Sequence, residues 1–335
     1  MLLIESGFPA SAPHPLLVLV AAVIVEAGLG ALAATLPGLP RPEAWLRNAA
    51  AELDRRLNRP GRGERTLAVR GAIAVALLVL PPVAVAAYLQ TEAATVAWGW
   101  VLHLGVLLIL LGAGRLYRRV RAVGRGLETG RPEAARRALA ALCRRDVGEM
   151  DDFTVARTAI EAGADGFVRR CAAPVLWYLI GGLPGAALAW SAGGIAVILG
   201  RPGPGGGRFA WIATRLDNGL AWLPDGLAAL LIAAAALVAP GANPWRAARG
   251  AFRRTPAAGT AGERLRARAA LAGAFDLSLG GPARIDGRSR PVPWIGDGRA
   301  RVGPVEIRQT LLLLATACLI LSGLLAAVLL GLARF

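Results

Sequence analysis

The stretch "QTLLLLATACLILSGLLAAVLLGL", residues 309–332, contains no charged side chain. It is longer than the roughly 20 apolar residues that an α-helix needs to cross a bilayer. Three other apolar runs of about this length occur, at residues 16–36, 71–89 and 95–113. The sequence therefore predicts an all-α, polytopic integral membrane protein with four clear transmembrane helices.

Two further apolar runs are interrupted by helix-breaking residues. Residues 171–199 contain Gly181-Gly182 and Pro184-Gly185. Residues 219–240 carry Pro224-Asp225-Gly226 near their start. Because glycine and proline weaken or break helices, we expect two broken helices that either cross the membrane or re-enter it. The sequence leaves both possibilities open.

The chain is both apolar and strongly basic. Of its 335 residues, 55% are hydrophobic, and the formal net charge is +16. Arginines gather between the apolar runs, at about 41–70, 115–170 and 241–308. This distribution follows the positive-inside rule, so we expect a multi-pass protein of the cell inner membrane, in contact with the lipid bilayer and with cytoplasmic arginine-rich loops. Nucleic-acid binding is not expected, because no zinc-finger spacing or RNA-binding signature accompanies the charge.

Residues 115–170 have helical patterning of their own. Gly130 before Arg131-Pro132-Glu133 is typical of one helix ending and another beginning. Apolar residues then follow at helical spacing, namely Ala135, Ala138, Leu139 and Leu142. We therefore expect an amphipathic cytoplasmic helical insert at about 115–170 and an arginine-rich cytoplasmic loop at about 241–308. No internal repeat stands out, so a single membrane domain over 1–335 is predicted.

Acidic side chains in or beside apolar runs are the first candidates for chemistry. Three cysteines and two histidines are too few for a His/Cys metal site or a disulfide framework. Glu26 lies within the run 16–36, where an unpaired carboxylate is costly. It either pairs with an arginine of another helix or serves as a site carboxylate, and the sequence leaves both interpretations open.

A second set of candidates surrounds residue 161. Glu161 and Asp165 are four residues apart and would share one helix face. With Arg145 and Asp146 they offer oxygen ligands for magnesium and a guanidinium group for phosphate. Taken alone, these residues are explained more simply by a solvated helix face, so two interpretations remain.

Two more polar groups stand beside apolar or turn sequences. Arg215 and Asp217 lie in "TRLDNGLAWLP" (214–224), which is either a polar helix end at the membrane boundary or a ligand contact. Trp294 and Asp297 lie in "PWIGDG" (293–298), which is either a plain Pro/Gly turn or a ligand contact.

Taken in order, these segments resemble the CobD/CbiB family of cobalamin-biosynthesis membrane proteins, the adenosylcobinamide-phosphate synthases. No single motif decides the resemblance, but six segments occur in the family's order. They are "LPRPEAWLRNAAAELDRRLNR" (39–59), "RRDVGEMDDFTVARTAIE" (144–161), "APVLWYLIGGLPGAALAW" (173–190), "TRLDNGLAWLP" (214–224), "LAGAFDLSLGGP" (271–282) and "PWIGDG" (293–298).

The resemblance implies a ligase that acts late in cobalamin (vitamin B12) biosynthesis. Its reaction would be ATP-dependent amide formation, joining adenosylcobyric acid to an aminopropanol phosphate to give adenosylcobinamide phosphate. It implies ATP and Mg²⁺ as cofactors, and a corrinoid and an aminopropanol phosphate as substrates. Other cobalamin-synthesis enzymes are possible partners.

The resemblance also implies roles for individual residues. Catalytic roles would fall to Glu161, Asp165 and Asp217, and Glu161 and Asp165 would hold Mg²⁺. Contacts with substrate or phosphate would fall to Arg145, Asp146, Arg215, Trp294 and Asp297, and Glu26 is added to them because of its place in an apolar run.

The chain departs from the family pattern at several polar positions. Residues 165–170, "DGFVRR", stand where the family has Glu-Asn-x-x-Asp-Gly. Residues 190–200, "WSAGGIAVILG", replace a stretch that carries Lys, Asn and Asp. These departures point to an alternative: a catalytically degenerate member that acts as a corrinoid-binding, scaffold or AmpE-like membrane regulatory protein.

Overall fold

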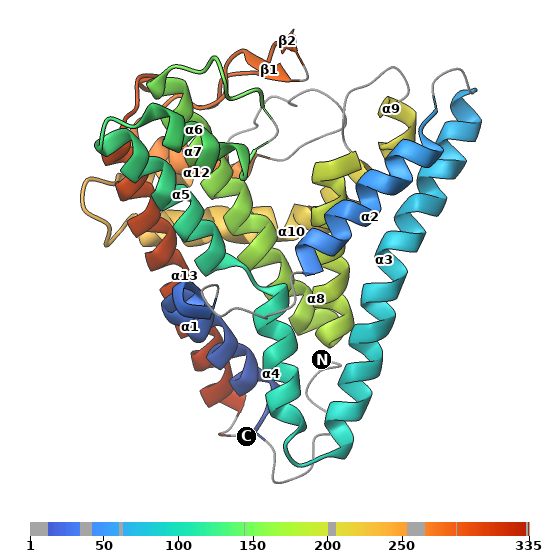
Figure 1. Cartoon of the computed structure of the whole chain (residues 1–335). Coiled ribbons are helices and arrows are strands. Elements are labelled where there is room, and N and C mark those ends of the chain that lie inside the picture. Colours follow the sequence, from blue (N-terminus) through green and yellow to red (C-terminus); the bar gives the residue numbers. More distant parts are fainter. Residues whose placement is uncertain are drawn as a thin grey trace. The chain divides into compact units, whose positions relative to one another are not determined.

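A computed structural model describes residues 13–33, 42–59, 63–143, 145–199, 206–252, 265–285, 287–332 and 334. The described part is almost entirely helical (Figure 1), which confirms the predicted all-α class. Its elements are α1 (Pro15–Ala33), α2 (Pro42–Leu57), α3 (Glu64–Thr95), α4 (Gly99–Leu110), α5 (Ala113–Glu128), α6 (Pro132–Ala140), α7 (Asp152–Phe167), the π-helical turn η1 (Val168–Ala172), α8 (Ala173–Leu199), α9 (Gly206–Phe209), α10 (Trp211–Ala235), α11 (Pro244–Phe252), α12 (Arg266–Phe275), β1 (Ala283–Ile285), β2 (Arg288–Arg290) and α13 (Pro304–Leu332).

Five helical segments of the described residues are long and apolar enough to cross a membrane, which confirms a polytopic helical protein. The predicted spans 71–89 and 309–332 lie within α3 and α13. The bounds 95–113 are wrong, because Val96 is extended and ends α3, and α4 begins at Gly99. The five segments are Glu64–Thr95, Gly99–Glu128, Asp152–Leu199, Trp211–Ala235 and Pro304–Leu332.

The first predicted span, 16–36, is helical as far as Ala33, and residues 34–36 lie outside the described part. Side chains of this helix are described only over Pro15–Glu26, and this part is shorter than the five candidate spans. A membrane crossing by α1 therefore stays a prediction.

The first interrupted run is broken where the glycines predict it. Within α8, Gly182 has φ +64° and ψ −152°, a conformation that is essentially restricted to glycine. The Leu183 amide donates to Gln90 Oε1 at 2.8 Å instead of continuing the helical ladder. A Cβ at Gly182 would lie only 2.2 Å from that same oxygen. The break therefore depends on a close approach of the Gln90 side chain.

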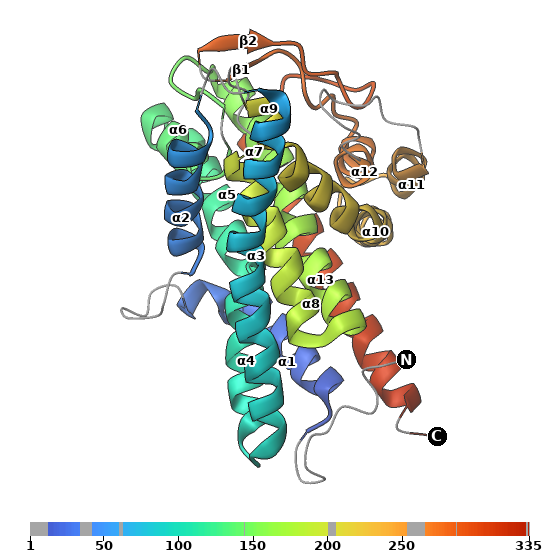
Figure 2. The same ribbon diagram turned by 90° about the vertical axis from the view of Figure 1, so that its right-hand side faces the viewer.

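The second interrupted run differs from the prediction. α10 begins at Trp211 rather than near residue 219, and Pro224 lies inside it. Its C-terminal part, residues 223–235, runs crosswise to α13 (Figures 1 and 2), and α11 and α12 run along that part. Length and composition therefore qualify α10 as a span, while its second half lies across the direction of α13.

The described helices divide into two compact units, each built from separated stretches of the chain. Unit 1 comprises Met1–Ala22, Ala34–Leu111 and Ala173–Trp222, and unit 2 comprises Val23–Ala33, Gly112–Ala172 and Leu223–Phe335.

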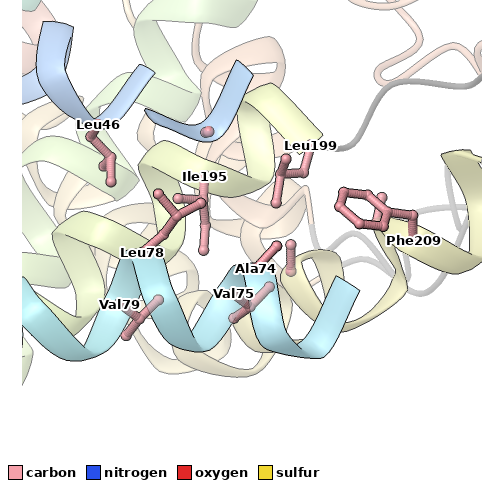
Figure 3. Close-up of a cluster of buried hydrophobic side chains, with 11 residues drawn as sticks. Leu46, Ala74, Val75, Leu78, Val79, Ile195, Leu199 and Phe209 are labelled. Atoms are coloured by element: carbon pink, nitrogen blue, oxygen red, sulfur yellow. The ribbon is translucent and has the colours of Figure 1, made fainter. Parts of the chain in front are cut away.

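In unit 1 an apolar core joins α2, α3, α8 and α9 (Figure 3). Leu46, Leu78, Ile195 and Phe209 are buried together there. Gly71 allows α3 to touch the chain at α9, because a Cβ there would lie 2.0 Å from the Phe209 carbonyl oxygen. Burying such side chains supplies the main favourable term in folding.

In unit 2 the helical patterning predicted for residues 115–170 is confirmed by α5, α6 and α7, while the cytoplasmic position of this insert stays a prediction. Ala135 and Leu139 of α6 are fully buried, as their spacing indicated. A Cβ at Gly126 would lie 2.7 Å from the Ala135 nitrogen, so α5 and α6 pack with almost no space between them.

The stretch predicted only as an arginine-rich loop contains α11, α12 and an antiparallel hairpin of β1 and β2. Small residues bring the two helices together. A Cβ at Gly250 would lie 2.2 Å from the Ala269 carbonyl oxygen, and one at Gly273 would lie 2.3 Å from that of Arg246. Alanine and glycine at these positions therefore allow backbone contact. The arginine-rich composition of this stretch, from which a loop was predicted, gives no sign of such contacts.

Candidate functional site

Glu161 lies at the centre of a buried charged cluster in unit 2. Its Oε2 accepts from Arg145 Nη2 at 2.6 Å, and its Oε1 accepts from the Gly280 amide at 2.7 Å. Only 3% of the Glu161 side chain is exposed. One carboxylate thus connects α7 to the segment before it and to the segment after α12. Gly280 has φ +94°, and a Cβ there would lie 2.3 Å from the Pro293 carbonyl oxygen.

Asp165 lies one turn further along α7 and pairs with Arg268 of α12. Arg268 Nε lies 2.5 Å from Asp165 Oδ1, and its Nη2 donates to Oδ2, so the pair is bidentate. Arg268 Nη1 also lies 3.8 Å from Glu161 Oε2. The predicted shared helix face is confirmed, but it is a buried contact with α12 and not a solvated surface.

These pairings bear on the magnesium ion that the resemblance implies. Both carboxylates already accept from guanidinium or amide groups, and two arginines neutralise their charge. No group of three or more His, Cys, Asp or Glu side chains suited to a metal occurs in the described part of the chain. In this arrangement Glu161 and Asp165 do not fit a resident magnesium ion.

Arg157 occupies the same side of α7, one turn before Glu161. It is 9% exposed, and its guanidinium carbon lies 5.0 Å from the centre of the Trp294 ring. Its Nη1 donates to the Ala300 carbonyl at 3.2 Å, and its Nη2 donates to Thr154 Oγ1 at 3.3 Å. Trp294 also packs on Gly281, where a Cβ would lie 2.5 Å from the indole. The Trp294 turn is therefore anchored on α7.

Asp146 joins the same region through the β-hairpin. Its amide donates to the Arg284 carbonyl at 2.9 Å, and its Oδ2 accepts from the Gly287 amide at 2.7 Å. Asp297, in contrast, is exposed. Five predicted residues therefore lie along the contact between residues 145–165 and 268–301: Arg145, Asp146, Glu161, Asp165 and Trp294. We call Arg145, Arg157, Glu161, Asp165 and Arg268 the α7 cluster.

Glu26 has surroundings of a different kind. It is 4% exposed, and its Oε1 accepts from the Gly114 amide in the first turn of α5 at 3.3 Å. A carboxylate at a helix N-terminus satisfies amides that have no intrahelical partner and interacts favourably with the helix dipole. This contact favours a structural role, and a substrate contact by Glu26 stays a prediction.

Arg215 and Asp217 belong to unit 1. They are two residues apart on α10 and therefore do not face each other. Asp217 is 5% exposed, whereas Arg215 is exposed and lies over the Trp211 ring at 5.6 Å. The predicted roles of both residues remain predictions.

Three residues of this region were not predicted from the sequence. Arg157 precedes Glu161 by four residues, and this spacing could have identified it, because such residues share a helix face. Arg268 lies among many arginines, and nothing local distinguishes it from a solvated one. Gly280 contributes a backbone amide, which no side-chain pattern reveals.

Comparison with known proteins identifies the family of the chain. The sequence model of a family described as CobD/Cbib protein matches residues 19–314. The chain belongs to the CobD/CbiB family.

Individual relatives resemble it along most of their length. A protein named cobalamin biosynthesis protein CobD from Sinorhizobium sp. is 30% identical, and the match covers 93% of this chain and 98% of the relative. Proteins of the same name from Mycobacterium tuberculosis (strain H37Rv) and Rhodobacter capsulatus are 33% and 28% identical. These matches cover 79% and 88% of this chain, and 82% and 91% of the relatives. No solved structure matches the chain.

Proposed function

We propose that this protein acts in cobalamin biosynthesis as a membrane-bound carbon–nitrogen ligase. It would join adenosylcobyric acid to an aminopropanol phosphate and yield adenosylcobinamide phosphate. The family match and the relatives' shared name support the pathway. The observation that carries the reaction type is the α7 cluster, which concentrates buried guanidinium groups beside a glycine-containing turn.

Amide formation from a carboxylate needs activation, because oxide is a poor leaving group. ATP, when bound, would supply the phosphoryl group that makes the acyl carbon susceptible to attack. The amine nitrogen then forms the new bond, phosphate leaves, and the nitrogen loses a proton. Every reacting group in these steps is anionic except the amine, so the protein must supply positive charge.

The α7 cluster can supply that charge from a fixed position. Arg145 is held by Glu161, and guanidinium groups bind phosphate oxygens in a planar, bidentate manner. Glu161 already accepts two hydrogen bonds, so we assign it as a positioning residue that holds Arg145 and Gly280. Asp165 would hold Arg268 in the same way.

One observation favours a non-catalytic role instead. Residues 190–200 lack the Lys, Asn and Asp expected from the family resemblance. Removing one transition-state donor costs roughly 10²- to 10³-fold in rate, so several losses would abolish turnover. The second candidate is therefore a corrinoid-binding, scaffold or AmpE-like regulatory protein of the same membrane.

Complementation separates the two candidates. A strain without its own synthase would carry this gene and grow on adenosylcobyric acid as the only corrinoid. We expect growth with the wild type and with the exposed-site control Glu149→Gln, and loss of growth with Glu161→Ala. No growth with a wild-type protein that is present in the membrane would reject the ligase and favour the second candidate. The same strain would show, by co-purification, whether other cobalamin-synthesis enzymes bind the protein.

A further inference from the structure

Arg157 differs from the other arginines of the α7 cluster in having no carboxylate within ion-pair distance, although Glu161 and Asp151 act on it from further away. Its two hydrogen-bond acceptors, the Ala300 carbonyl and the Thr154 hydroxyl, are uncharged, and both bonds are long. Its Nε is buried and has no hydrogen-bond partner among the described residues. Arg145 and Arg268, in contrast, each pair with a carboxylate.

This difference leaves the Arg157 guanidinium without a direct ion pair. Arg145 and Arg268 form ion pairs with Glu161 and Asp165, whereas Arg157 interacts with the charges of Glu161 and Asp151 only at longer range. A buried charge is costly unless it is paired, and Arg157 is 9% exposed. An anionic ligand at Arg157 would supply the direct ion pair that this guanidinium group lacks.

Trp294 leaves the edge of the Arg157 guanidinium group uncovered by its ring. The ring covers one face of Arg157 at 5.0 Å, a cation–π contact that fixes the guanidinium plane. The N–H groups point outward within that plane, the direction from which an oxyanion is bound. Trp294 itself is 45% exposed, so this contact lies at the protein surface.

A second arginine lies in the same contact between α7 and residues 294–301. Arg301 follows Ala300, and its guanidinium carbon lies 5.7 Å from the centre of the Phe153 ring in the first turn of α7. Arg301 is exposed and can move toward a ligand. Two guanidinium groups favour a doubly charged phosphate over a singly charged carboxylate.

We propose that Arg157, stacked on Trp294 and assisted by Arg301, binds the phosphate group of the amine substrate. The identity of this phosphate ester rests on the proposed function, whereas the oxyanion site rests on the contacts of Arg157. Arg157 is not among the substrate and phosphate contacts predicted from the sequence, which are Arg145, Asp146, Arg215, Trp294, Asp297 and Glu26.

Equilibrium binding to the full-length protein in detergent tests the proposal. The probes are aminopropanol phosphate, aminopropanol, inorganic phosphate and adenosylcobyric acid. The variants are Arg157→Gln, Arg157→Lys and the matched control Arg125→Gln, which removes an exposed arginine of α5 in the same unit. Size-exclusion chromatography and circular dichroism would verify the fold of each variant.

We expect Arg157→Gln to weaken aminopropanol phosphate and inorganic phosphate at least tenfold. Arg157→Lys should weaken them less, and Arg125→Gln should leave them unchanged. Folded Arg157→Gln protein that binds aminopropanol phosphate within twofold of the wild type would overturn the proposal. So would a loss confined to adenosylcobyric acid, because the site would then be for a carboxylate. A further outcome is a protein that binds inorganic phosphate through Arg157 and still fails complementation. That result would reject the ligase assignment but keep the oxyanion site.

Discussion

Glu161 and Glu149 each pair with an arginine, but only the Glu161 pair lies away from water. The side chains of Glu161 and Arg145 are 3% and 14% exposed, whereas those of Glu149 and Arg284 are 79% and 51% exposed. Exposed pairs add little to stability, while removing one partner of a buried pair leaves an uncompensated charge.

We therefore predict that Glu161→Gln lowers the free energy of unfolding by about 3 kcal/mol, because Arg145 loses its counter-ion. Glu149→Gln should change it by less than about 1 kcal/mol. Denaturant unfolding of both variants in the same detergent gives the comparison. Equal effects of the two substitutions would show that the Glu161 pair is not buried in the native protein.

Asp151 provides a pH-dependent contribution at the start of α7. Its carboxylate accepts from the Thr154 amide at 2.9 Å, and the contacts with Thr154 hold the pKa of Asp151 below its ordinary value. The native state therefore prefers the charged form. The stabilisation is complete above the unfolded-state pKa of about 3.9 and is lost as pH falls through the native pKa.

Replacing this cap should cost about 1 kcal/mol in Asp151→Ala. The melting-temperature difference between the wild type and this variant should be constant from pH 7 to pH 5 and shrink below about pH 4. Asp152→Ala, at the neighbouring exposed acid, is the control and should have a smaller effect. A difference that grows on acidification would contradict the cap.

At the level of elements, the break in α8 depends on one glycine of a pair. Gly182 has positive φ and touches Gln90, whereas a Cβ at Gly181 would meet nothing within 4 Å. We expect Gly182→Ala to destabilise the protein by about 1–3 kcal/mol through backbone strain and the clash with Gln90. Gly181→Ala should be nearly neutral. Thermal unfolding of the two variants distinguishes them, and equal melting temperatures would refute this account of the break.

The elements predicted best are those specified by local sequence. The last helix follows from a long apolar run. The turn between α5 and α6 follows from Gly130, which ends one helix, and from the proline that begins the next. The helices α11 and α12 escaped prediction because alanine and glycine contacts, not apolar stripes, hold them together. The early start of α10 was not predicted, because its first turns contain polar residues, which are typical of a loop. In the structure one of them, Asp217, is buried within the helix.

At the level of the whole molecule, charge asymmetry predicts the orientation in the membrane. The turn at residues 96–98 has no arginine, while α6 lies in the arginine-rich insert. We expect a membrane-impermeant maleimide to label Ala97→Cys in intact cells and Arg137→Cys only after permeabilisation. Both positions are exposed, and the native cysteines 143, 171 and 318 would first be replaced by serine. The reverse labelling pattern would show that the protein has the opposite orientation in the membrane.

The candidate site was predicted in part, for a physical reason. Glu161 and Asp165 were identifiable because their spacing of four residues places both carboxylates on one face of a helix. Their partners Arg268 and Gly280 come from more than 100 residues away, at separations of 103 and 119. Only the tertiary fold brings such segments together, so the sequence could not show the ion pairs and the backbone hydrogen bond that these carboxylates accept.

Turnover by the purified protein tests the central claim most directly. Full-length protein in detergent would be incubated with adenosylcobyric acid, aminopropanol phosphate, ATP and Mg²⁺, and the corrinoids analysed by mass spectrometry. We predict ATP-dependent formation of adenosylcobinamide phosphate by the wild type and by Arg125→Gln, with at least a 10²-fold lower rate for Glu161→Ala. Folded wild-type protein that binds the corrinoid yet forms no amide would contradict the ligase assignment.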